Sequence, residues 1–201
     1  MHQRLAAVLC ALWLAGCAST QLDAQWTNPD YSGRNLRGAS VLVACEAQEP
    51  TLQRICEDQV SAQVSAMGGT PTRATQLQGL NAAPPAGNDP YIAAARGVGA
   101  RAIVRTTLTT GAVLAGPSGP TIGIGVGGGG GSVGGFGGIS FPIGGTRVSN
   151  AYASETAMID PANGAIMWSA RASSSTSQDT TAQIAELAKT AAAAIKQAGF
   201  F

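Results

Sequence analysis

The segment Ala39-Ser40-Val41-Leu42-Val43-Ala44 is short, rich in apolar and β-branched residues, and bounded by Gly38 and Cys45. Such a segment is typical of a buried strand. Pro50 suits the first turn of a helix, and the pair Gly68-Gly69 is a typical helix end. Five residues between them recur with helical spacing on one face: Leu52, Cys56, Val60, Gln63 and Met67. The segment therefore predicts a buried strand that packs under an amphipathic helix.

The following residues continue the alternation of strands and helices. Residues 70–77 predict a short strand, and residues 81–89 predict a loop. Asp89 can cap a helix that begins at Pro90, and residues 100–114 are dense enough in Thr and Val for another strand. Strand–helix–strand–helix–strand is the pattern of a sheet with parallel members.

The second half of the chain predicts an antiparallel hairpin and a helix. Residues 146–159 and 165–173 read as its two strands, joined by a turn that ends in Asn163-Gly164. Thr180 and Gln183 form a capping box for a helix through residue 198, after which Phe200 and Phe201 should pack on the domain. We therefore expect an α+β fold, a mixed β-sheet with helices mainly on one face.

The N-terminal residues have the three parts of an export signal. A basic start precedes an apolar run at residues 5–15, which is too short for the ~20 residues that span a membrane. Leu14-Ala15-Gly16-Cys17 resembles the lipobox of bacterial lipoprotein signal peptides. The resemblance implies that residues 1–16 are removed and that acyl chains on Cys17 attach the protein to a membrane. The alternatives are an ordinary secretory signal that is cleaved elsewhere, or a buried helix.

The residue after the lipobox cysteine bears on the choice of membrane. Ala18 stands where proteobacterial lipoproteins retained in the inner membrane often have Asp. We therefore expect an outer-membrane lipoprotein that faces the periplasm. No later segment approaches 18 consecutive apolar residues.

The charge of the processed chain is balanced. Of twelve basic and eleven acidic side chains, only Arg4 lies in residues 1–16, together with the single histidine, His2. A nucleic-acid partner would require a concentrated basic face, so none is expected. Other envelope proteins are possible partners.

Two of the four cysteines lie in the expected domain. Cys10 lies in the signal segment and Cys17 in the lipobox, which leaves Cys45 and Cys56. An even pair in an oxidising compartment predicts a disulfide, because the strand that ends at Cys45 packs under the helix that carries Cys56. Two buried free thiols are the alternative. Two thiols without histidine do not complete a zinc site, and we expect no metal or other cofactor.

The stretch from residue 17 to 38 is a polar, turn-rich lead to the domain at 39–201. Its order of Trp26, Asn28-Pro29-Asp30, Tyr31 and Gly33 resembles the opening of an uncharacterised bacterial lipoprotein family. The resemblance implies that the aromatic residues dock onto the folded domain. A flexible tether is the alternative.

Two later motifs match the same family in the right order. They are the Gly-Ala-x-Ala-hydrophobic pattern at residues 99–104 and Asp160, Gly164 and Trp168-Ser169. The layout is distantly similar to the amino-terminal domain of the Tol-system translocation protein and to the curli-secretion lipoprotein. By this resemblance Trp168 is a core or sheet-face anchor, and the sharper alternative is that it stacks on a ligand.

Residues 111–145 are unusually rich in glycine, which makes up sixteen of the thirty-five. Glycine loses the most backbone entropy on ordering, so a flexible insertion is expected. The alternative is a hairpin, because apolar residues alternate around Ile122-Gly123-Ile124 and Ile139-Ser140-Phe141. Each apolar half is shorter than the ~9–11 residues of a membrane strand. Residues 125–130 fit G-x-G-x-x-G, but no helix-opening sequence follows, so no nucleotide site is expected.

The sequence contains few candidate catalytic groups. Without histidine after residue 16, the Ser-His-Asp, Cys-His and His-metal arrangements are excluded. We expect Glu57-Asp58 to be solvated on a helix, whereas Glu155 lies in a strand and could be buried and functional. Three arginines could line a small anion site or form a solvated rim: Arg96, Arg101 and Arg105.

These observations predict a protein without catalytic residues. Its expected role is a non-catalytic envelope function, either structural or in protein interaction. One alternative is an auxiliary lipoprotein that binds lipid or another small molecule in a cavity between helices and sheet. Another is an oligomeric secretion or pore subunit that uses residues 117–145.

Overall fold

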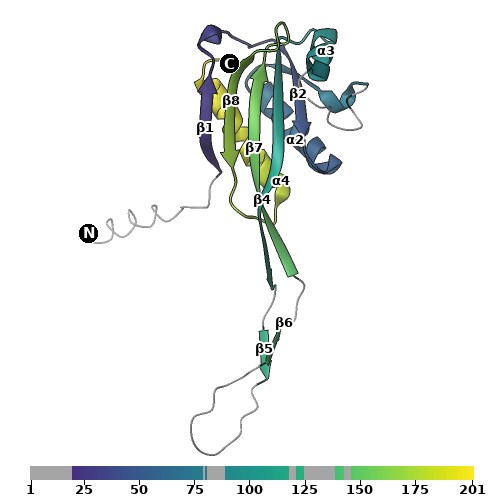
Figure 1. Ribbon diagram of the computed structural model, residues 1–201, viewed down its shortest axis with the longest axis vertical. Helices are drawn as coiled ribbons and strands as arrows, with labels where there is room; N and C mark the ends of the chain where they lie inside the picture. The colour runs from purple at the N-terminus through teal and green to yellow at the C-terminus, as the bar shows by residue number, and fades with distance from the viewer. Residues whose placement is uncertain (1–19, 79, 81–88, 118–120, 125–138, 143–145) are drawn as a thin grey trace, which may run out of the picture.

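The structure is a computed structural model that describes residues 20–78, 80, 89–117, 121–124, 139–142 and 146–201. Six strands form one mixed sheet in the order β1-β8-β7-β4-β2-β3 (Figure 1). Its strands are β1 (Gln21–Thr27), β2 (Ser40–Glu46), β3 (Thr70–Arg73), β4 (Ala102–Pro117), β7 (Thr146–Ile159) and β8 (Ile166–Ser173). The helices are α2 (Pro50–Ala66), α3 (Asp89–Gly97) and α4 (Thr180–Gln197), with 3-10 turns η1 (Pro29–Tyr31) and η2 (Ala74–Gln76).

The sheet confirms the expected α+β class. β2 pairs in parallel with β3 and β4, while β4, β7, β8 and β1 are joined antiparallel. Helices α2 and α4 cover one face of the sheet, where the larger group of buried side chains lies. The smaller helix α3 covers part of the opposite face, against β2 and β4.

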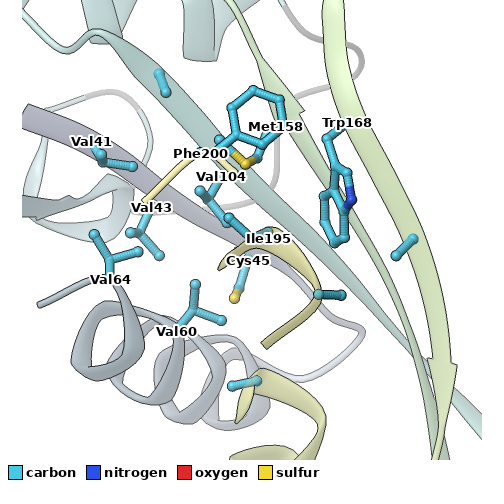
Figure 2. Packing of buried hydrophobic residues seen from close by; sticks show 14 of the residues in the cluster. Val41, Val43, Cys45, Val60, Val64, Val104, Met158, Trp168, Ile195 and Phe200 are labelled. Carbon is cyan, nitrogen blue, oxygen red and sulfur yellow. The ribbon is translucent and has the colours of Figure 1, made fainter. Parts of the chain in front are cut away.

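The main core lies between the sheet and the two long helices. Figure 2 shows Val43 and Cys45 of β2 together with Val60 and Val64 of α2. Trp168 of β8 is fully buried in the same cluster. Burial of each such side chain contributes about 1.5–3 kcal/mol. Phe200 and Phe201 are also buried there, as expected from the sequence.

The lead to the domain differs from the turn-rich segment that its composition suggested. Residues 21–27 form β1, an edge strand that pairs with β8 from Gln21–Ser173 to Thr27–Trp168. Nearly all of β1 is exposed, which explains why its sequence reads as polar. Its strand conformation therefore comes from pairing with a segment about 150 residues away.

The capping box expected at the start of α4 is wrong by one residue. Asp179 is the N-cap, and its carboxylate accepts a hydrogen bond from the backbone N–H of Ala182 at 2.9 Å. The Gln183 side chain instead donates to the backbone oxygen of Asn150 and to Ser175. Gln183 thereby joins Ser175, in the segment between β8 and α4, to Asn150 of β7.

The described parts of the glycine-rich stretch are paired strands and not a plain flexible insertion. β4 and β7 stay paired as far as Pro117 and Thr146, with one register shift between Thr110 and Val113. Beyond them β5 (Thr121–Ile124) and β6 (Ile139–Pro142) pair antiparallel, with residues 122 and 141 as partners. The hairpin leaves the body of the sheet at the end where β1 begins (Figure 1). Residues 125–138, which carry the G-x-G-x-x-G pattern, lie outside the described residues.

Among the helices that the structure describes, none has the length and apolar composition needed to cross a membrane.

Candidate functional site

A row of side chains crosses the face of the sheet that α2 and α4 leave uncovered. Arg171 of β8 is the register partner of Glu155 on β7, and Glu155 is the partner of Thr107 on β4. Thr107 is in turn the partner of Glu46 on β2, to whose carboxylate its hydroxyl donates at 3.0 Å. Side chains in such positions share one face, with Cβ atoms about 4.5–5.5 Å apart in the antiparallel pairs. Across the sheet the row therefore carries a cationic, an anionic, a hydroxyl and a second anionic group.

Trp26 lies beside this row at the edge of the sheet. Its register partner on β8 is Ser169. Because Trp168 and Ala170 are buried under the helices, Ser169 and Trp26 belong to the opposite face. The Trp26 side chain is 50% exposed, so this residue of the lead does not dock fully onto the domain.

A shallow groove joins Trp26 to the charged row. It has a volume of about 320 Å³ and is lined by Ala24, Gln25, Trp26, Glu155, Ser169, Ala170 and Arg171. Ligand pockets typically start at about 300 Å³, and they combine an aromatic surface with a few polar groups. Glu155 and Arg171 are exposed at this groove. Glu155 is therefore not buried, which was one possibility for a strand residue, but it does belong to a candidate site.

Tyr91 and Glu46 form a polar cluster at the far end of the row. The Tyr91 side chain is buried, and burial together with the nearby Glu46 carboxylate raises the pKa of its hydroxyl. Arg105 approaches the same carboxylate at 4.0 Å. This cluster joins α3 to β2 and β4.

The three arginines considered for an anion site have different environments. Arg96 donates to the backbone oxygens of Pro161 and Ala162, at 2.6 and 2.9 Å. Arg105 pairs with Glu46, and Arg101 is exposed. The structure therefore does not assemble the three into one site.

Glu57 corrects the expectation that the Glu57-Asp58 pair is solvated. Asp58 is exposed, but Glu57 is 0% exposed. The Glu57 carboxylate accepts hydrogen bonds from the backbone N–H of Cys45 at 3.4 Å and of Thr75 at 3.3 Å, and from the Thr75 hydroxyl. Burial raises the pKa of Glu57 above its ordinary 4.5, and these hydrogen bonds oppose the rise only in part. The helix positions 53, 57, 60 and 64 form one buried stripe, a signal that could have found this carboxylate.

The two cysteines of the domain are joined. The disulfide between Cys45 and Cys56 connects β2 to α2 across Cα atoms 6.0 Å apart. The lipidation expected at Cys17 lies outside the described residues.

The turn after β7 is held by residues of the lead. Asp160 is buried and pairs with Arg34 at 2.6 Å. Burial alone would raise the pKa of Asp160, but the hydrogen bonds from Ala162 and Arg34 and the charge of Arg34 lower it below its ordinary 3.8. The amide of Asn163 also donates to the Tyr31 hydroxyl at 2.8 Å. Tyr31 therefore docks on the domain, whereas Trp26 stays half exposed on it.

Trp168 is a core residue, as the resemblance implied. It is fully buried, which leaves no face for stacking on a ligand. Its indole nitrogen lacks a hydrogen-bond partner within the part of the chain that the structure describes.

The spaces between α2, α4 and the sheet are small. Two of them measure about 10 Å³ each and are lined by residues such as Val60, Thr106 and Ala188. Such a space holds at most about one water molecule. An acyl chain does not fit either space in this conformation. No group of three or more potential metal ligands occurs among the residues described.

Comparisons with known proteins found neither a matching family model nor a matching curated protein. The family expected from the sequence therefore stays a prediction. Solved structures with some similarity include a PelC dodecamer from Paraburkholderia phytofirmans, at 15% identity and TM-score 0.48, covering 84% of this chain and 94% of that chain. The lipoprotein GNA1162 from Neisseria meningitidis is 17% identical with TM-score 0.43, covering 79% and 96%. A putative neuraminyllactose-binding hemagglutinin homolog from Helicobacter pylori is 11% identical with TM-score 0.38, covering 83% and 85%. At these identities and TM-scores, the likenesses assign neither a family nor an activity to the chain.

Proposed function

We propose that this chain is a membrane-anchored lipoprotein of the bacterial envelope that acts through binding contacts and not through catalysis. The observation that carries the proposal is the position of the lipobox, whose Cys17 lies four residues before Gln21, the start of β1. Four extended residues span at most about 14 Å. An acylated Cys17 would therefore hold the edge of the sheet close to the lipid surface.

Two features support the location. The Cys45–Cys56 disulfide fits an oxidising compartment such as the periplasm. Ala18 favours the outer membrane over the inner one. The role proposed for the anchored domain is structural or in protein interaction, with the uncovered face of the sheet available for contact.

Mass spectrometry of the detergent-extracted protein tests the anchor. We expect an N-terminal Cys17 that carries acyl chains, and outer-membrane fractions that contain the protein. Cys17→Ser should release the processed protein from the membrane. An unmodified Cys17, or a Cys17→Ser variant that fractionates like the wild type, would refute the anchor.

The paired hairpin specifically favours a second candidate, an oligomeric secretion or pore subunit. β4 and β7 run beyond the body of the sheet toward the end where β1 begins, so an anchored domain would point the hairpin toward the membrane. The native mass of the extracted protein, with and without residues 117–145, tests this candidate. A ring that falls to monomers on deletion supports it, and a monomer in both cases excludes it.

A further inference from the structure

We propose that the groove beside Trp26 binds one ring of a neutral saccharide, with Arg171 and Glu155 as the residues that bind its hydroxyl groups. The inference deepens the proposed function and depends on it only for the compartment in which such a sugar would be met.

The exposed indole of Trp26 is the first support. An aromatic ring presents a flat apolar face with a polar edge, and a pyranose ring presents a matching flat face of C–H groups. Trp26 is half exposed on a strand whose other side chains are mostly polar. Among the residues that the structure describes, it is also the one aromatic residue that lines the groove.

The charges in the groove are the second support. Arg171 offers several N–H donors and Glu155 two acceptor oxygens, from directly paired positions on neighbouring strands. One cation beside one anion gives no net attraction for an anionic or a cationic ligand. Adjacent hydroxyl groups on a sugar ring can accept from the guanidinium and donate to the carboxylate at the same time.

The shape of the groove is the third support. Its volume of about 320 Å³ suits a single ring rather than a buried oligomer. Ala24 and Ser169 are small residues in its lining, so a ring can approach the sheet closely.

Fluorescence quenching provides the test. The detergent-extracted protein, in a detergent without a sugar headgroup, is titrated with three neutral tetrasaccharides, of β-1,4-linked N-acetylglucosamine, α-1,4-linked glucose and β-1,4-linked mannose. The processed chain has two tryptophans, and acrylamide reaches Trp26 while Trp168 is buried. We expect at least one tetrasaccharide to protect Trp26 from acrylamide in a saturable way.

Variants distinguish specific binding in the groove from nonspecific binding to the protein surface. Because the Trp26 variants lose the fluorescent reporter, tetrasaccharide binding by all variants is measured by isothermal titration calorimetry. Trp26→Ala should weaken binding at least tenfold, Trp26→Phe should retain part of it, and Arg171→Gln and Glu155→Gln should each weaken it severalfold. Leu22→Ala is the matched control, because Leu22 is exposed on the same strand but does not line the groove. Lack of protection by all three tetrasaccharides, or binding that survives Trp26→Ala, would overturn the inference. Neither result would affect the lipid anchor, which is measured separately by mass.

Discussion

Glu57 and Cys45 are joined by a hydrogen bond from the backbone N–H of Cys45 to the Glu57 carboxylate, with an N···O distance of 3.4 Å. Cys45 is also bonded through its sulfur to Cys56, the residue directly before Glu57. Strand β2 and helix α2 are therefore held at one point by a covalent bond and by a buried carboxylate. The same carboxylate also accepts a hydrogen bond from the backbone N–H of Thr75, which follows β3. It therefore connects three elements of the fold.

Removal of the disulfide should lower the stability of the domain. The bridged residues are 11 apart in the sequence, and the chain-entropy model gives about 3 kcal/mol for a loop of this size. We expect the variant with both Cys45→Ala and Cys56→Ala to lose a similar amount in urea unfolding followed by circular dichroism. Wild-type protein unfolded with a reductant present should lose stability in the same way. An unchanged midpoint in both experiments would contradict a structural role for the bridge.

Neutralisation of Glu57 should lower stability and change its dependence on pH. In Glu57→Gln one carboxylate oxygen becomes an amide N–H group, which faces a backbone donor, and an unsatisfied buried group costs about 1–3 kcal/mol. Because the folded-state pKa of Glu57 is raised, the wild type should lose stability as pH rises from 4.5 through that higher value. The variant should lack this loss.

Urea midpoints measured from pH 4 to 8 test the Glu57 prediction. Glu186→Gln is a suitable control, because Glu186 is exposed on α4, where it pairs with the exposed Lys189. The control should follow the wild-type curve. A Glu57→Gln curve parallel to that of the wild type would mean that Glu57 does not titrate in this range.

Asp160 should have the opposite dependence on pH. Its pKa is lowered in the folded state, so its contribution is present above the ordinary value of 3.8 and is lost as pH falls through the lower folded-state value. Asp160→Asn should cost about 1–3 kcal/mol at pH 7, because a hydrogen bond between charged groups is lost while Arg34 stays partly buried. Acid unfolding of the two proteins checks this, and the difference should shrink toward pH 2. A constant difference at every pH would contradict the ion pair as its source.

Shortening of the long hairpin should leave the domain intact. The buried residues that the structure describes lie between Leu36 and Leu108 and between Tyr152 and Phe201. If residues 117–146 are replaced by Asn-Gly, a two-residue turn joins the register partners Gly116 and Arg147. Thermal unfolding should change by only a few degrees. A large loss of stability would show that the hairpin contributes to the core.

Local sequence patterns were sufficient for elements that fold against their neighbours. The apolar run of β2, the proline at the start of α2 and the Asn163-Gly164 turn all lie where the sequence predicted them. At Gly164 the backbone has a φ of 76°, a conformation that glycine adopts at little cost, which explains the turn signal.

The candidate groove could not be predicted in the same way. Trp26 and Arg171 are brought together only by the pairing of β1 with β8, and β1 has the polar composition of a loop. Glu57 was missed because a carboxylate beside an exposed Asp58 on a helix is normally solvated. The spacing of the buried stripe could have indicated its burial, but the donors that satisfy its carboxylate come from β2 and from the residues after β3.

The pairing of β1 with β8 also determines when the groove can form during synthesis. Ser173 donates to Asp23 across 150 residues of chain, whereas the bridged cysteines are only 11 residues apart. At about 5–20 residues per second, β8 is completed roughly 8–30 seconds after β1. Until then the first strand has no partner in the sheet. A chain truncated before β8 keeps both bridged cysteines but lacks the strand on which the groove depends.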